Sequence, residues 1–72
     1  MITVKVRFTW HAEVESMPDE GINHNEVVET LRKSEKTTRL SDEKFKFLYR
    51  DLEVVAQRKP GYWLVITCYR VK

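Results

Sequence analysis

Residues 44–71 read KFKFLYRDLEVVAQRKPGYWLVITCYRV, and this stretch decides the fold. Apolar and aromatic residues gather in three short segments, and in the first of them they alternate with basic residues, as in a half-buried β-strand. Turns at residues 50–51 and 59–61 separate the segments, and the second turn contains proline and glycine in favourable positions. The stretch predicts three strands, over about 44–49, 52–58 and 62–71.

The last of these strands is apolar on both sides. Strict alternation divides its side chains into Leu64, Ile66 and Cys68 on one side and Trp63, Val65 and Tyr69 on the other. A strand that is apolar on both faces is normally central in its sheet. We therefore expect a central position for this strand.

A further strand is predicted at the start of the chain, over residues 2–10. Its apolar set alternates with polar residues and consists of Ile2, Val4, Val6, Phe8 and Trp10. The alternation continues through Ala12 and Val14. The sequence leaves open whether this strand runs to about Glu15 or the chain turns helical at His11.

One amphipathic helix is predicted over about 23–34. Asn23 is a suitable N-cap, and Glu26 three residues later completes a variant of the capping box. Ile22 can pack on Val27 as a hydrophobic staple. This local chemistry fixes where the helix begins.

The predicted architecture is a single α+β domain over residues 1–72, with the order β-α-β-β-β. It consists of a four-stranded, mostly antiparallel sheet with the one main helix packed on one face. Residues 16–22 are expected as a loop, and residues 35–43 as a loop or short edge strand. One short helix cannot cover both faces, and the second face holds either Trp63 and Tyr69 or their neighbours. We expect part of it to bind a partner or a second copy of the chain, with Trp63 and Tyr69 as the candidate interface.

Composition excludes several classes of protein. The longest apolar run, residues 62–66, is too short to span a bilayer. A single cysteine, Cys68, rules out an intramolecular disulfide and fits a reducing compartment, so a cytoplasmic location without membrane contact is expected. The chain lacks the Cys-x-x-Cys and His-x-x-x-His spacings of metal sites, and we expect neither metal nor cofactor.

The net charge of +2 hides an asymmetry along the chain. Residues 1–31 hold two basic and six acidic side chains, a net charge of −4, whereas residues 32–72 hold 11 basic and five acidic ones, a net charge of +6. Such a molecule is electrically polar if the two segments occupy different faces, and it can steer a charged partner. Alternatively, the charges merely keep the surface solvated.

Several short motifs resemble a known family pattern. They are Thr9-Trp10-His11-Ala12, Met17, Gly21-Ile22, Glu26-Val27 and Val65-Ile66-Thr67-Cys68-Tyr69. The pattern is similar to that of small bacterial, archaeal and phage proteins thought to be related to the RelE-like and BrnT-like ribonuclease toxins of toxin–antitoxin systems. The resemblance implies one or two helices against an antiparallel sheet, and RNA cleavage without a metal. This sequence departs from the family pattern in two ways. The spacing from His11 to Gly21 is one residue longer than in the pattern. Acidic residues, at about Glu15 and Glu20, replace two arginines that the pattern expects.

The candidate catalytic residues are His11 and Tyr69, which carry over from this resemblance. A histidine titrates in the range needed to accept the 2′-hydroxyl proton or to protonate the leaving oxygen. A tyrosine can donate a proton or stack on a base. The alternative is that His11 is an ordinary surface histidine at the end of a strand.

Basic and aromatic residues interleave in the C-terminal half of the chain. Lysine and arginine neutralise phosphates, and aromatic rings stack on unpaired bases. The predicted nucleic-acid-binding set is Arg39, Lys44, Lys46, Arg50, Arg58, Lys59 and Arg70. The alternative is that the rings form the core and the cations line the outer faces of the strands.

Two functions follow as expectations. The first is a small intracellular protein that acts on RNA, with catalysis retained or altered. The second is a protein-interaction module, homodimeric or inhibitory, whose acidic segment from Glu13 to Glu29 docks on a basic surface of a host or antitoxin protein.

Overall fold

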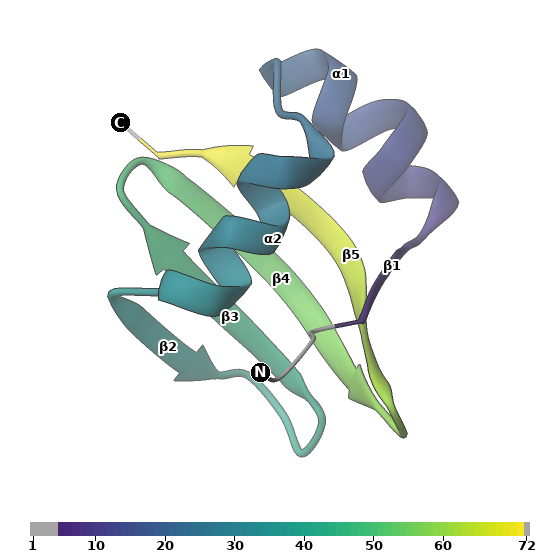
Figure 1. The fold of residues 1–72 in the computed structure, drawn as a ribbon, viewed down its shortest axis with the longest axis vertical. Helices are drawn as coiled ribbons and strands as arrows, with labels where there is room; N and C mark the ends of the chain where they lie inside the picture. Colours follow the sequence, from purple (N-terminus) through teal and green to yellow (C-terminus); the bar gives the residue numbers. More distant parts are fainter. Residues whose placement is uncertain (1–4, 72) are drawn as a thin grey trace.

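In the computed structural model, which describes residues 5–71, five strands form one sheet (Figure 1). Their bounds are Val6–Phe8 (β1), Lys36–Arg39 (β2), Lys44–Tyr49 (β3), Leu52–Lys59 (β4) and Tyr62–Arg70 (β5). The spatial order is β1-β5-β4-β3-β2. β1 pairs with β5 in parallel and the other neighbours pair antiparallel, so the sheet is mixed.

The prediction of a four-stranded sheet with the order β-α-β-β-β is therefore wrong, both in the number of strands and in the order of the elements along the chain. The additional strand is β2, the short edge strand that is one of the two alternatives for residues 35–43. It pairs with β3 along its whole length although none of its side chains is apolar. An edge strand needs only one row of backbone partners, and charged side chains there protect the sheet from further pairing. A polar segment can therefore form a strand that the hydrophobic pattern does not reveal.

The chain turns helical immediately after β1. A π-helical segment, His11–Ser16 (η1), continues directly into α1, Met17–Glu20. Thr9 starts this turn, because its Oγ1 accepts a hydrogen bond from the backbone N–H of Ala12 at 3.2 Å. The prediction of a loop over residues 16–22 is therefore wrong for Met17–Glu20, which form α1. Ile2 and Val4 of the predicted first strand lie outside the described residues.

The second helix, α2, spans His24–Lys33 and has the capping box expected from the sequence. The Asn23 side chain accepts a hydrogen bond from the Glu26 backbone N–H at 2.9 Å, and the Glu26 carboxylate accepts one from the Asn23 N–H at 3.2 Å. Ile22 and Val27 are both buried in the core. Gly21 ends α1 with a φ of +65°, a left-handed conformation that glycine adopts without strain.

The core lies between the helices and one face of the sheet. Its sheet side is formed by buried residues of β3, β4 and β5, and its helix side by Ala12, Met17 and Val27. The Trp63 ring packs edge-on against Phe47, with 5.2 Å between centroids. Trp63 thus belongs to the core side of the sheet, where α2 packs on β3 and β4 (Figure 1).

A β-bulge in β5 shifts the alternation of that strand. Val55 and Ala56 of β4 pair with Thr67 and Val65, which leaves Ile66 as an extra residue. The predicted division of this strand is wrong beyond the bulge, because one extra residue reverses which side chains share a face.

After the bulge, Cys68 lies opposite buried Val54 and is itself buried. Tyr69 lies opposite Glu53, on the other face. Trp63 and Tyr69, predicted together as a partner interface, therefore lie on opposite faces of the sheet.

Candidate nucleic-acid interface

The face of the sheet turned away from α2, which we call the open face, is strongly basic. Strand register places five cations on it: Arg7, Lys36, Lys44, Lys46 and Lys59. Glu53 is the one acidic side chain that the described strands contribute to this face. No helix in residues 5–71 covers the open face, so its cations are available to a polyanion.

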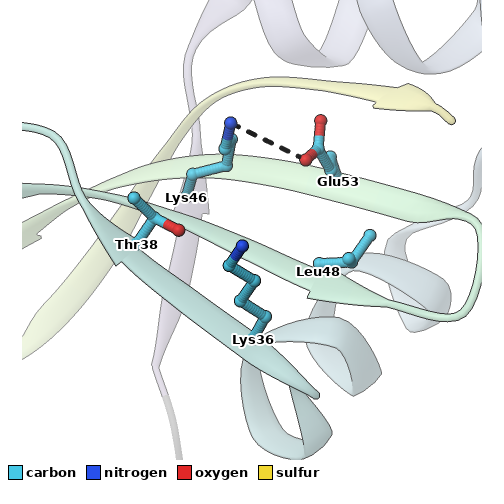
Figure 2. A pocket seen from close by; sticks show the side chains of 5 residues that line it. All are labelled: Lys36, Thr38, Lys46, Leu48 and Glu53. Atoms are coloured by element: carbon cyan, nitrogen blue, oxygen red, sulfur yellow. Dashed lines mark ion pairs between the residues drawn. The ribbon is translucent and has the colours of Figure 1, made fainter.

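A cavity of about 100 Å³ lies on the open face, lined by Lys36, Thr38, Lys46, Leu48 and Glu53 (Figure 2). The side chains come from β2, β3 and β4, which register brings side by side. Lys46 Nζ lies 3.8 Å from Glu53 Oε1. The Glu53 side chain is only 16% exposed, so its carboxylate is more sheltered than those elsewhere on the surface.

Tyr69 adds a third polar group beside Glu53. The neighbouring Glu53 carboxylate, as a hydrogen-bond acceptor and as a negative charge, raises the pKa of Tyr69 together with partial burial. The hydroxyl is therefore protonated at neutral pH. Lys46, Glu53 and Tyr69 form one polar row across β3, β4 and β5.

At the β1 end of the open face, Arg7 and Tyr62 form a second feature. The guanidinium carbon of Arg7 lies 5.2 Å from the centroid of the Tyr62 ring. A planar cation over an aromatic ring makes a flat surface on which a base can stack. The open face thus combines charge with stacking groups.

Three of the seven predicted nucleic-acid-binding residues, Lys44, Lys46 and Lys59, lie on the open face. The other predicted residues lie elsewhere. Arg39 pairs with Asp42 of the following loop at 3.1 Å.

Two further arginines of that set cover aromatic rings. Arg50 occupies the turn after β3 and lies over the Tyr49 ring at 5.2 Å. Arg58 lies on the helix side of β4, over the Phe45 ring at 5.8 Å. The structure therefore does not bring all seven cations together.

Arg70, the last of the set, holds elements of the fold together. Its guanidinium lies 2.8 Å from the Glu26 carboxylate and 3.4 Å from that of Asp51, and it also donates to the Gly21 carbonyl. The Arg70 hydrogen bond holds the pKa of Glu26 below its usual range and raises that of Arg70 itself. Arg70 thus joins the end of β5 to the start of α2 and to the β3–β4 turn.

Sequence reasoning missed Arg7, Lys36, Thr38 and Glu53. Once β2 is paired with β3, the spacing of Lys36 and Thr38 gives the signal, since residues two apart in a strand share a face. Arg7 carries no local signal, because β1 meets β5 across more than fifty residues of chain.

The two candidate catalytic residues lie beside different carboxylates. His11 Nδ1 lies 2.9 Å from Glu15 Oε2 within η1, whereas Tyr69 lies opposite Glu53 in the sheet. No hydrogen bond or ion pair in the described part of the chain joins His11 to Tyr69.

The acidic segment forms a separate surface with exposed apolar residues. Trp10 is 68% exposed and Val14, one turn later, is 50% exposed. Glu13 and Glu15 lie in the same helical segment. This surface differs from the open face in both charge and position.

Comparison with known proteins finds no relative of this chain. The chain matches no family model, and no curated protein or solved structure shows significant similarity to it. Residues 5–71 hold no cluster of three metal-binding side chains. They also contain no helix long and apolar enough to cross a membrane.

Proposed function

We propose that this protein binds single-stranded RNA on the open face of its sheet. The observation that carries the proposal is the charge of that face, where five cations from the strands stand against Glu53. Electrostatic contact with phosphates supplies most of the affinity in such complexes. Tyr62 and Tyr69 add rings on which unpaired bases can stack.

A single strand fits this surface better than a duplex. Proteins that read the grooves of a duplex commonly insert a helix. Here η1 and α1 contain no lysine or arginine, and the only such residues of α2, Arg32 and Lys33, stand together in its last turn. The sheet offers its cations on an open surface, which suits an extended strand with splayed bases.

Fluorescence anisotropy with a labelled 12-nucleotide RNA tests this proposal. If three to five phosphates are neutralised, affinity falls roughly 20- to 130-fold between 50 and 200 mM salt. Replacing both Lys44 and Lys46 with alanine reduces the magnitude of the salt slope by about 1.4. Lys33→Ala on α2 removes a charge on the other side and is the control. Absence of binding at 50 mM salt would refute the proposal.

We propose binding without cleavage, because His11 lies in η1 beside Glu15 and not on the basic open face. Incubation with total RNA should leave the RNA intact, for the wild type and for His11→Ala alike. Cleavage by the wild type that disappears in His11→Ala would show that the protein is a ribonuclease, as the family resemblance implies.

A second candidate function is docking to a protein with a basic surface. The exposure of Trp10 beside acidic residues favours it, since a single aromatic anchor within a charged rim is a common interface arrangement. Cross-linking in cell extract compares wild type with Trp10→Ala, which leaves the open face intact. A basic partner cross-linked only by the wild type supports docking, and equal recovery by both proteins contradicts it.

A further inference from the structure

Glu53 has an unexpected position for a surface that binds phosphates. Its carboxylate lies among the cations of the open face, 3.8 Å from Lys46, with its side chain 16% exposed. A negative charge there works against phosphate binding. The pair of Glu53 and Lys46 instead suits a ligand with hydrogen-bond donors, which meet the carboxylate, next to an acceptor, which meets the ammonium group.

The bases of RNA differ in how well they fit such a site. The two oxygens of a carboxylate accept two parallel N–H donors. Among the four bases, only guanine presents two adjacent donors, N1–H and the N2 amino group, next to the O6 acceptor. Adenine and cytosine place one amino group beside an acceptor nitrogen, and uracil has one N–H between two carbonyls.

We propose that the Glu53 cavity binds the Watson–Crick edge of an unpaired guanine. Glu53 accepts from N1–H and the N2 amino group, and Lys46 donates to O6. Because a carboxylate has about four acceptor positions, Glu53 can accept from the base while Tyr69 stays opposite it in the sheet. This inference rests on the proposed RNA binding and specifies its base preference.

The size of the cavity is consistent with an edge and not with an enclosed nucleotide. Its volume is about 100 Å³, whereas sites that enclose a small ligand typically measure roughly 300–1,000 Å³. Only the base edge fits in the cavity, so the ribose and phosphate remain outside it. The preference is therefore local to one nucleotide of the bound strand.

Anisotropy titrations of uridine dodecamers, each with G, A, C, U or inosine at one central position, test the inference. We expect the G oligomer to bind about tenfold more tightly than the A, C and U oligomers. Inosine lacks the N2 amino group and should lose most of that gain. Because this comparison uses the wild type, it does not depend on whether a variant folds.

Two variants then locate the preference. Glu53→Gln, with its fold checked by circular dichroism, should bind all five oligomers with similar affinity. Glu29→Gln on α2 removes the same charge outside the open face and should keep the preference for G. Equal affinities for all oligomers with the wild type would overturn the inference and leave RNA binding standing. Binding of none would instead overturn the proposed function itself.

Discussion

Replacement of Arg70 by methionine should destabilise the fold by an amount that depends on pH. The variant keeps most of the aliphatic length of the side chain and removes the guanidinium. That group bonds Glu26 at 2.8 Å and Asp51 at 3.4 Å, across three elements of the structure. Its loss therefore removes the ion pairs that join the end of β5 to the start of α2 and to the β3–β4 turn.

The magnitude follows from the exposure of the two main partners. A hydrogen bond to a charged group contributes about 1.5–3 kcal/mol when sheltered, and an exposed ion pair about 0–1 kcal/mol. Arg70 and Glu26 side chains are 31% and 34% exposed, between these limits. We expect a loss of about 1–2 kcal/mol, which corresponds to roughly 5–15 °C in the melting temperature of a domain of this size.

The pH dependence has a definite sign. Arg70 lowers the pKa of Glu26 in the folded state relative to the unfolded chain. The stabilisation is therefore complete above the usual carboxyl range and is lost as the pH falls through the lowered pKa of Glu26. The difference between wild type and Arg70→Met should be largest near neutral pH and should shrink in acid.

Thermal melts by circular dichroism at pH 7 and at acid pH measure both effects. A double-mutant cycle with Glu26→Gln isolates the pairwise energy, because glutamine still suits its place in the capping box. Arg32→Met, an exposed change on α2, controls for the loss of one positive charge. A melting temperature within about 2 °C of the wild type at pH 7, or a difference that persists unchanged in acid, would refute the reasoning.

Three further changes test the packing and the local chemistry. Val54→Ala, in the core, should lower the free energy of unfolding in urea by about 2 kcal/mol. Val55→Ala, on the open face, should lower it by less than about 1 kcal/mol. Equal losses would contradict the assignment of the two residues to opposite faces. Asn23→Ala removes the N-cap and should destabilise by about 1 kcal/mol, against little change for Asn25→Ala in the same melts. Cys68 is buried and its pKa is raised to about 11, so Ellman's reagent at pH 8 should label it only after urea is added; rapid labelling of the folded protein would disprove its burial.

The features predicted well from sequence depend on contacts between near neighbours. The start of α2 is such a feature, since Asn23 and Glu26 are three residues apart and bond each other directly. The turn at Gly61, with a φ of +83°, is another. Short-range hydrogen bonds and backbone preferences act independently of the rest of the chain, so the sequence alone reveals them.

The features that were missed depend on distant partners or on a single extra residue. β1 pairs with β5 only because the whole fold brings them together. β2 has no hydrophobic pattern, so the sequence leaves a loop and an edge strand as alternatives, and the strand forms because β3 offers a free edge. The candidate site has the same origin, since Glu53 and Tyr69 are sixteen residues apart and meet only through the shifted register of β5.

Because of this shift in register, the number of residues in β5, and not only their type, decides which side chains lie on the open face. Deleting Ile66 would remove the bulge and keep every later pair, because Val65 and Thr67 already face neighbouring residues of β4. Inserting one residue between Thr67 and Cys68 would instead reverse the orientation of every later residue in β5. The Tyr69 ring would then turn beneath the helices and the Cys68 thiol would emerge into solvent. A gain of one codon at this point would be more damaging than most substitutions, because it would move the Tyr69 hydroxyl away from Glu53 and place a polar ring in the core at once.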